Sequence, residues 1–421
     1  MTTDRFGNPL APGLPYARGA ILTSTADDYA KLRHAWRIIA ARIEKDGPES
    51  VFNFTGLERG LRMDPSDLPF ADDELAPALY LDRLTERALE HLGGSPARHD
   101  VVLFNRLTGA TVATHLALVR PGDTVVGVSA GYSHPTVVRA AALAGARFVD
   151  TVGADAFAAA LEREPRVALV VLTRLAVTYE ALPTDALRRV VALAHAKGAR
   201  VYVDDAGGAR VGPAVLEQPR LLELGVDVGA TGLDKYGTTG PRLGLLGGEK
   251  AFVAEIRARA FELGLEARPM LYPAALRSLE QYDPARVRAL VACTKGVAAA
   301  LRARLGDRVR ETPVTAQLHG DDILAIALER AGLAAPPIVP FEALAAFAVL
   351  LLRDHGVITV HFAGLPPGTP AILFKFVPPE TLARFGGAEA LARAVDDALG
   401  KLAGLVGRPE EIRALLLGDG P

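Results

Sequence analysis

The feature that most constrains the fold is a series of short, uninterrupted apolar runs between residues 101 and 230. Most of them are separated by an Ala- and Leu-rich stretch that is long enough for a helix. Continuous apolar strands that alternate with helices are typical of a parallel sheet covered by helices on both faces. We therefore predict an α/β fold with a mostly parallel sheet. The predicted strands are 101–104, 124–128, 147–149, 167–172, 200–203 and 226–230.

The C-terminal third of the chain has a different pattern, which predicts a small α+β domain. A ten-residue apolar run at 343–352 is far shorter than the ~20 residues of a membrane span, so it predicts a buried helix. Further helices surround the strands, and one of them covers 388–406. The predicted strands here are 315–318, 323–328, 357–362 and 371–376.

These patterns predict a division of the chain into three parts. Residues 1–49 form an N-terminal arm followed by a helix, residues 50–295 a large domain, and residues 296–421 the small C-terminal domain. Half of the residues are hydrophobic and 23% are charged, which excludes an intrinsically disordered chain.

Charge and cysteine content exclude several classes of function. Lys and Arg number 47 against 49 Asp and Glu, and 47 − 49 gives a net charge of −2, which argues against a nucleic-acid partner. The single cysteine, Cys293, excludes a disulfide framework and a metal site built from cysteines, and we predict no metal. No secretory signal opens the chain and no apolar run is long enough for a membrane span, so we expect a cytoplasmic protein.

Candidate ligand-binding residues follow the predicted strands, where open parallel sheets bind their ligands. Thr108, Gly109 and Ala110 follow the first strand and open a helix, and free N–H groups at a helix start suit a phosphate. A plain helix cap at Thr108 is the alternative interpretation. His134 or Tyr132, after the second strand, offers a ring to cover a planar ligand.

Two acids and a lysine follow later strands. Asp204 and Asp205 come directly after 200–203, where buried acids need a cationic partner; a helix cap or a metal site is the alternative. Lys235 lies in a turn after 226–230, where a solvated surface lysine is the alternative. In this order, a phosphate-binding turn, a ring, an acid and a lysine are the layout of a pyridoxal 5'-phosphate (PLP) site. The lysine forms a Schiff base with the aldehyde, and the acid keeps the pyridine nitrogen protonated.

Two stretches resemble the fold-type-I PLP enzymes, and among them the branch of bacterial selenocysteine synthase and the glucosaminate-phosphate ammonia-lyases. Residues 51–56, Val-Phe-Asn-Phe-Thr-Gly, are similar to the branch's Val-Ile-Asn-x-Thr-Gly. Residues 232–244, which contain Gly-Leu-Asp-Lys-Tyr-Gly-Thr-Thr-Gly-Pro, are similar to its Ser-Gly-Asp-Lys-x-x-Gly-Gly-Pro. The resemblance covers residues 50–285. It implies a fold-type-I PLP-dependent transferase architecture, with a large domain of mostly parallel sheet flanked by helices and a small C-terminal α+β domain.

The resemblance also implies roles for individual residues. Lys235 would be the Schiff-base lysine, and Asp204 would pair with the pyridine nitrogen, with Asp205 as the alternative. His134 would stack on the ring, with Tyr132 as the alternative. Gly232 stands where the family has a hydroxyl, and Thr231 lies one residue earlier. The cofactor-binding residues implied in this way are Thr108, Gly109, Ala110, His134, Asp204, Ala206, Thr231 and Lys235.

The substrate-binding candidates are Arg59, Arg242, Arg268 and Lys375, for each of which an ordinary charge is the alternative interpretation. Aminotransferases of this fold usually bind the substrate carboxylate with a small-domain arginine. Lys375 stands at the matching strand, and a lysine cannot form the two-pronged contact of an arginine.

We therefore predict a PLP-dependent lyase of the elimination or ammonia-lyase type, acting on an amino acid or an amino-sugar acid. An aminotransferase is the alternative, and tRNA-dependent selenium transfer is disfavoured by the net charge. The resemblance also implies a homodimer or a larger homo-oligomer.

Overall fold

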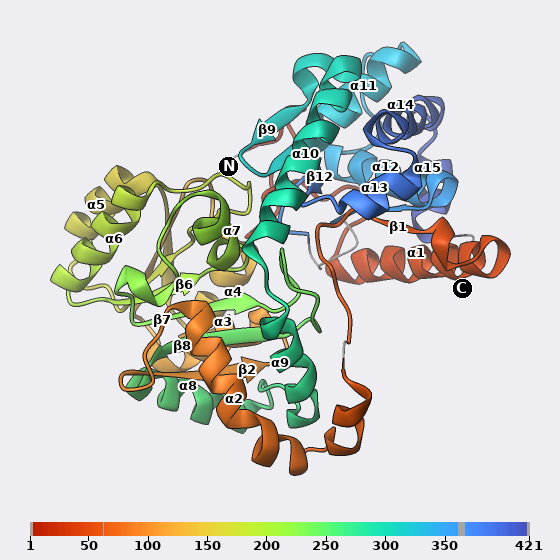
Figure 1. Ribbon diagram of the computed structural model, residues 1–421. Helices are drawn as coiled ribbons and strands as arrows, with labels where there is room; N and C mark the ends of the chain where they lie inside the picture. The colour runs from red at the N-terminus through yellow and green to blue at the C-terminus, as the bar shows by residue number, and fades with distance from the viewer. Residues whose placement is uncertain (1–2, 62, 361–366, 419–421) are drawn as a thin grey trace. The chain divides into compact units, whose positions relative to one another are not determined.

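The computed structural model describes residues 3–61, 63–360 and 367–418 (Figure 1). The chain divides into two compact units. The first, here called the terminal unit, consists of Met1–Gly56 and Ala289–Pro421, and the second, the central unit, consists of Leu57–Arg288. The domain boundaries predicted after residues 49 and 295 stay predictions.

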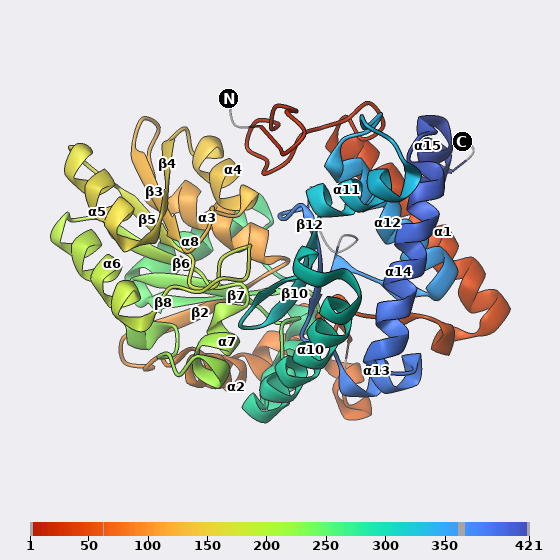
Figure 2. The same ribbon diagram turned by 90° about the horizontal axis from the view of Figure 1, so that it is seen from above.

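The central unit is built on a seven-stranded sheet with the order β2-β8-β7-β6-β5-β3-β4 (Figure 2). Neighbouring strands from β7 to β4 pair in parallel, and only β8 runs antiparallel to its neighbours β2 and β7. The mostly parallel sheet is therefore confirmed. The strands are β2 (His99–Phe104), β3 (Thr124–Ser129), β4 (Arg147–Val152), β5 (Leu169–Leu172), β6 (Arg200–Asp204), β7 (Val228–Gly232) and β8 (Gly244–Glu249).

All six strands predicted for this unit occur, with ends shifted by a few residues. The sequence analysis missed β8. Its sequence, Gly-Leu-Leu-Gly-Gly-Glu, has three glycines and no β-branched residue, so it lacks the composition that usually marks a strand. Glycine is required there by close packing, because a Cβ on Gly248 would lie 2.5 Å from the carbonyl oxygen of Asp227.

Both faces of this sheet are covered. Along β5, Leu169 and Val171 join one apolar core, whereas Val170 and Leu172 join the other, because side chains alternate along a strand. Helices α3 (Leu107–Leu118), α4 (Pro135–Leu143) and α8 (Lys250–Leu263) contribute to the first core. Helices α2 (Leu75–Leu92), α5 (Gly153–Arg163), α6 (Thr184–Ala196) and α9 (Tyr272–Glu280) contribute to the second. Figure 2 shows α4 and α2 on opposite sides of the strands.

The terminal unit contains two small sheets. One has three antiparallel strands in the order β12-β10-β9, and in the other β1 pairs in parallel with β11. The strands are β1 (Phe52–Asn53), β9 (Arg310–Thr312), β10 (Thr315–His319), β11 (Val357–Ile358) and β12 (Ala371–Lys375). The helices are α1 (Thr25–Asp46), α11 (Gly320–Ala331), α12 (Pro340–His355), α13 (Pro379–Phe385), α14 (Ala388–Leu405) and α15 (Pro409–Leu417), and α10 (Pro284–Leu305) ends in this unit.

The prediction of a strand at 323–328 is wrong, because these residues lie in helix α11. A short apolar run does not distinguish a buried strand from a buried helix by its pattern alone. The helix signals lie outside the run: Asp321 and Asp322 in the first turn and Gly332 in the left-handed conformation after the end. The predicted strands at 315–318 and 371–376 are confirmed. The strand predicted at 357–362 is confirmed only at 357–358, as β11; residues 359 and 360 are not in a strand, and residues 361 and 362 lie outside the described residues.

Helix α12 forms the centre of the terminal unit. Every residue from Pro340 to Leu352 is buried, which confirms the helix predicted at 343–352. The buried Glu342 carboxylate accepts hydrogen bonds from the backbone N–H groups of Ile21 (2.6 Å) and Leu22 (3.0 Å). This acid therefore fixes the N-terminal segment to the helix. Among the described helices, none combines the length and hydropathy that a membrane span needs.

Candidate active site

Lys235 lies three residues beyond β7, at the carboxyl end of the parallel strands. Its Nζ lies 3.5 Å from Oδ1 of the buried Asp234. The other oxygen of Asp234 accepts a hydrogen bond of 2.9 Å from Nε of Arg59. One buried carboxylate is therefore shared by two cations.

Positive charge dominates around this lysine. The pKa of Lys235 is lowered, mainly by burial and further by Arg59 and Arg242, while Asp234 opposes the shift. Burial raises the pKa of Asp234, but Lys235, Arg59 and Arg242 outweigh it and bring the value to about 2. The pKa of Arg242 falls to about 10 because of burial and the neighbouring Arg59 and Arg106. The amine thus loses its proton more readily than an exposed lysine, in surroundings that suit an anion.

The two adjacent acids at the end of β6 differ in their surroundings. Asp205 forms a fully buried ion pair with Arg174, with Nη2–Oδ2 at 2.5 Å and Nε–Oδ1 at 3.2 Å. The Asp204 side chain is 7% exposed and has no hydrogen-bond partner among the described residues. Burial and then Asp205 raise the pKa of Asp204 to about 7, and Lys235 opposes this. Asp204 is therefore the acid available to a ligand, within electrostatic reach of the lysine.

His134 caps the N-terminus of α4, where its Nδ1 accepts a hydrogen bond of 3.1 Å from the N–H of Thr136. Burial, with contributions from Arg139 and Lys235, lowers the pKa of His134 to about 4. The ring is thus neutral at neutral pH and lies within reach of the lysine charge. Tyr132, the alternative, is partly buried two residues earlier.

The start of α3 holds the residues expected to bind phosphate. The helix begins at Leu107, and no side chain caps its first turn, which contains Thr108, Gly109 and Ala110. A Cβ on Gly109 would lie 3.0 Å from Oδ1 of Asn105, so a larger residue would crowd this turn. The N–H groups of Gly109 and Ala110 already donate to the carbonyl of Arg106 (2.9 and 3.3 Å), so this helix start offers an anion the N–H groups that precede them.

Thr231 and Ala206 contact each other between β7 and the turn after β6. The hydroxyl of Thr231 donates to the carbonyl of Ala206 (3.2 Å) and accepts from Nη1 of Arg210 (3.2 Å). This hydroxyl therefore links the segment that carries Asp204 to the segment that carries Lys235.

One of the four substrate-binding candidates lies apart from this group, and another belongs to the terminal unit, so its role at this site stays a prediction. Arg268 is exposed and forms an ion pair with Asp73. Lys375 is buried at the end of β12, in the terminal unit. Arg59 and Arg242 are the candidates that the structure brings to Lys235.

The sequence analysis missed Thr173 and Arg174, which follow β5. The Thr173 hydroxyl is buried and has no hydrogen-bond partner, and Arg174 neutralises Asp205. Both residues directly follow the predicted strand 167–172, so the rule that selected Asp204 and Lys235 would also have selected them.

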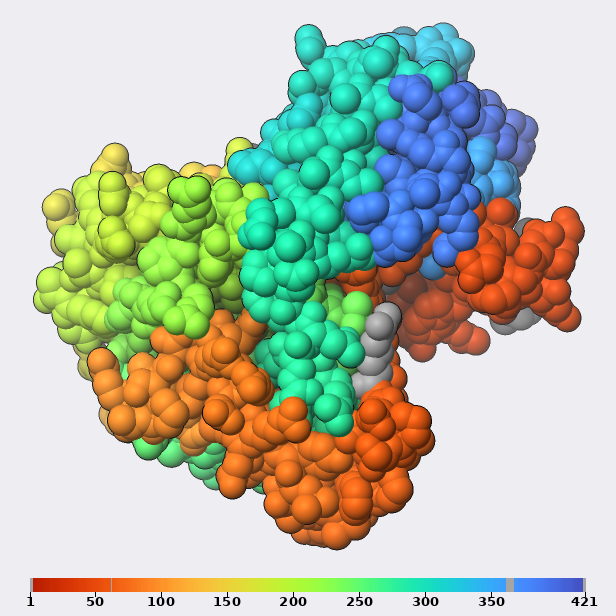
Figure 3. All heavy atoms as spheres, in the orientation of Figure 1, coloured from red at the N-terminus to blue at the C-terminus, as the bar shows by residue number. Residues whose placement is uncertain are grey.

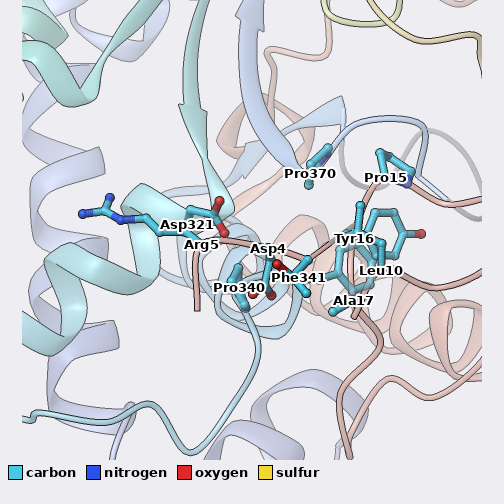
Figure 4. A pocket seen from close by; sticks show the side chains of 11 residues that line it. Asp4, Arg5, Leu10, Pro15, Tyr16, Ala17, Asp321, Pro340, Phe341 and Pro370 are labelled. Carbon is cyan, nitrogen blue, oxygen red and sulfur yellow. The ribbon is translucent and has the colours of Figure 1, made fainter. Parts of the chain in front are cut away.

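The described residues contain no group of three or more His, Cys, Asp or Glu side chains that could hold a metal ion. A separate hollow in the terminal unit is lined by Asp4, Arg5, Tyr16, Asp321 and Phe341, among others (Figure 4). It contains none of the predicted site residues.

A parallel sheet with a lysine, an acid and a ring at its carboxyl end defines the class of fold-type-I PLP enzymes. No family model matches the chain. The UPF0425 pyridoxal phosphate-dependent protein of Methanothermobacter thermautotrophicus is 31% identical over 403 residues, 94% of this chain and 100% of the relative. A protein of the same description from Methanosphaera stadtmanae is 28% identical over 359 residues, 84% of this chain and 90% of the relative. The chain belongs to the UPF0425 pyridoxal phosphate-dependent protein family.

Solved structures confirm the predicted fold class. SepCysS, in a complex with the SepCysE N-terminal domain, matches with a TM-score of 0.58 and 14% identity, covering 86% of this chain and 98% of that one. N-Succinyldiaminopimelate aminotransferase from Mycobacterium tuberculosis matches with a TM-score of 0.56 and 18% identity, over 86% of this chain and 99% of the aminotransferase chain. Serine palmitoyltransferase from Sphingomonas wittichii matches with a TM-score of 0.55 and 17% identity, over 90% of this chain and 84% of the transferase chain. At these identities the likeness concerns the fold alone.

Proposed function

We propose that this protein is a PLP-dependent lyase of the elimination or ammonia-lyase type, acting on an amino acid or an amino-sugar acid. Its relatives are named pyridoxal phosphate-dependent proteins, which makes this chain a PLP-dependent protein. The observation that carries the site assignment is the carboxyl group of Asp204. It is buried at the end of β6 without a hydrogen-bond partner in the described chain, within electrostatic reach of Lys235.

The residues at this edge of the sheet fit PLP. A buried acid without a partner suits a protonated ring nitrogen, and such a cation would restore the charged form of Asp204. Lys235 would attach the cofactor, and His134 would cover its ring. The uncapped start of α3, with Arg242 nearby, would hold the phosphate. Asp205 is committed to Arg174 and does not compete for this role.

When bound, PLP withdraws electrons from the substrate carbon that carries the amino group. The chain must then move a proton at that carbon. The pKa of Lys235 is lowered, mainly by burial, which is the direction that a general base needs. Arg59 would bind the substrate's carboxylate and would thereby share its charge between that group and Asp234.

The lyase assignment rests on the similarity of residues 51–56 and 232–244 to the selenocysteine synthase and ammonia-lyase branch. The lysine at position 375 supports it, since aminotransferases of this fold usually have an arginine there. The second candidate is an aminotransferase, favoured by the fold likeness to N-succinyldiaminopimelate aminotransferase.

Borohydride trapping tests the cofactor site. We expect the purified protein to absorb visible light, and reduction followed by peptide mapping to place the cofactor on Lys235. Lys235→Ala is expected to abolish the absorbance and the label, whereas Lys250→Ala, at an exposed position, keeps both. A label on a different lysine would contradict the assignment.

Product analysis distinguishes the two reactions. The loaded protein is incubated with panels of amino acids and amino-sugar acids, and ammonia and keto acid are measured together. A lyase releases both without a second substrate. Keto acid without ammonia, formed only when a second keto acid is supplied, would identify an aminotransferase instead.

We also propose that the protein is a homodimer. Six large apolar side chains are exposed along η2 (Pro65–Phe70), the start of α2 and the residues before them, in the orange region at the bottom of Figure 3. Several exposed apolar side chains in one segment of a chain are typical of protein interfaces. They are Leu61, Leu68, Phe70, Leu75, Leu79 and Leu81, here called the 61–81 patch.

A further inference from the structure

Arg210, on α7 (Gly208–Val215), is a fully buried cation that has no counter-ion among the described residues. Its Nη1 donates to the carbonyl of Gly232 (2.8 Å) and to the hydroxyl of Thr231 (3.2 Å). Its Nε and Nη2 are buried and have no hydrogen-bond partner within residues 3–61, 63–360 and 367–418. Burial lowers the pKa of Arg210 to about 10, which leaves the guanidinium charged at neutral pH. A buried charge without a partner is strongly unfavourable, so two N–H groups of this side chain require an acceptor.

The nearby acids are committed elsewhere. Asp205 forms its ion pair with Arg174, and Asp234 is shared by Arg59 and Lys235. Both contribute to the electrostatics of Arg210, but within the described parts of the chain no carboxylate lies at ion-pair distance from it. The part of the chain that the structure describes therefore supplies no anion for this guanidinium.

A second unused polar atom lies in the same region. Nε2 of His91, on α2, is buried without a hydrogen-bond partner. The His91 ring meets the Tyr282 ring edge-on, with centroids 4.7 Å apart. Burial lowers the pKa of His91 far below its usual value, and Arg210 lowers it further, so the neutral ring carries one N–H and lies within electrostatic reach of Arg210.

We propose that Nε and Nη2 of Arg210 bind a small inorganic anion of the chloride class, with the N–H of His91 as a further donor. The two N–H groups lie on one edge of the guanidinium and form a fork for an acceptor. Complete burial of Arg210 excludes an organic ligand or the substrate from this position. Because Nη1 of the same guanidinium holds residues 231 and 232, the anion would stabilise the end of β7 that leads to Lys235.

Crystallography of the full chain with sodium bromide tests the site directly. Bromide replaces chloride and has an anomalous signal that water lacks. We expect an anomalous peak in contact with Nε and Nη2 of Arg210. A water molecule or no density at this position in bromide-grown crystals would overturn the proposal.

Thermal unfolding provides a second test that does not depend on the cofactor or on activity. Replacing sodium gluconate by sodium bromide at equal ionic strength is expected to raise Tm by about 2 °C. His91→Phe keeps the ring contact with Tyr282 but removes the N–H, and Arg210→Gln removes the fork. We expect both to lose the anion-dependent shift, while Arg188→Gln, exposed on α6, keeps it. If Arg210→Gln fails to fold, His91→Phe decides, and an unchanged shift in that variant would contradict its role as a donor.

Discussion

The two carboxyl groups at the end of β6 are neighbours in sequence but differ in their partners within the fold. Asp205 forms an ion pair with Arg174 inside the protein, although burial still raises its pKa, whereas Asp204 has no hydrogen-bond partner among the described residues and a pKa raised to about 7. One acid therefore has a cationic partner within the chain, and the other has none among the described residues. This difference leads to opposite expectations for their substitution.

Asp204→Asn is expected to stabilise the protein without cofactor at neutral pH. The folded state raises the pKa of this carboxyl from 3.8 to about 7. It therefore holds a proton that the unfolded chain has lost, and stability falls as the pH rises between these values. Removing the acid is therefore expected to raise the free energy of unfolding by up to about 4 kcal/mol above pH 7 and to leave it unchanged below pH 3.8. Denaturant unfolding of the cofactor-free protein at pH 5 and pH 8 measures the effect.

Asp185→Asn, at an exposed position on α6, is the matched control. It should leave the free energy of unfolding unchanged at both pH 5 and pH 8. Equal stability of the Asp204→Asn variant and the unmodified protein at pH 8 would show that the carboxyl is not strained by burial. With the cofactor bound, we expect the Asn variant to lose most of its activity.

Asp205→Asn is expected to destabilise the protein strongly. The substitution leaves Arg174 charged and fully buried without its partner. Breaking a buried ion pair by removing one member costs about 3–5 kcal/mol. Urea unfolding at pH 7 checks this, with Asp185→Asn again as the control. A loss below about 1 kcal/mol, as for an exposed pair, would contradict it.

The sequence predicts Lys235 and Asp204 as site residues because residues after parallel strands converge at one edge of the sheet, and the structure places both at that edge. It did not identify which acid is free, because that depends on Arg174, a residue distant along the chain that pairs with Asp205 only in the fold. Arg210 was missed for a similar reason. An arginine is usually exposed, and the small and apolar residues around Arg210 do not by themselves show that its side chain is buried.

At the scale of elements, continuous apolar runs predicted the buried strands and the buried helix α12, whereas α11 was assigned the wrong type and β8 was missed. Strands β5 and β6 follow from their apolar runs. Helix α11 was mistaken for a strand because all residues from Ile323 to Leu328 are buried, so no polar face marks the helical period. The glycine-rich β8 escaped detection because its pairing, not its composition, makes it a strand.

Helix α12 allows a test at this scale. Glu342→Ala removes the acceptor of two backbone N–H groups, so the amides of Ile21 and Leu22 are expected to exchange with solvent deuterium at least about 10-fold faster. Hydrogen-exchange mass spectrometry of the peptide around them provides the measurement. Glu329→Ala, on the exposed part of α11, should leave their exchange unchanged. Unchanged exchange in Glu342→Ala would show that other contacts hold this segment.

At the scale of the whole molecule, the 61–81 patch leads to a prediction about assembly. Leu68 is 61% and Leu79 is 58% exposed, and a charge at both positions opposes the burial of apolar surface. Leu68→Glu/Leu79→Glu is expected to shift a dimer to monomer in analytical ultracentrifugation. Leu143→Glu, on α4 outside the patch, should remain dimeric. A double variant that stays dimeric would place the interface elsewhere.

The parallel pairing of β1 with β11 joins Phe52 to Val357 and Asn53 to Ile358. The central unit, by contrast, is one continuous stretch of chain from Leu57 to Arg288. During synthesis on the ribosome, the central unit therefore emerges before β11 and is free to fold first. Phe52 and Asn53 can pair as β1 only after residues 357 and 358 have been translated, about 300 residues later.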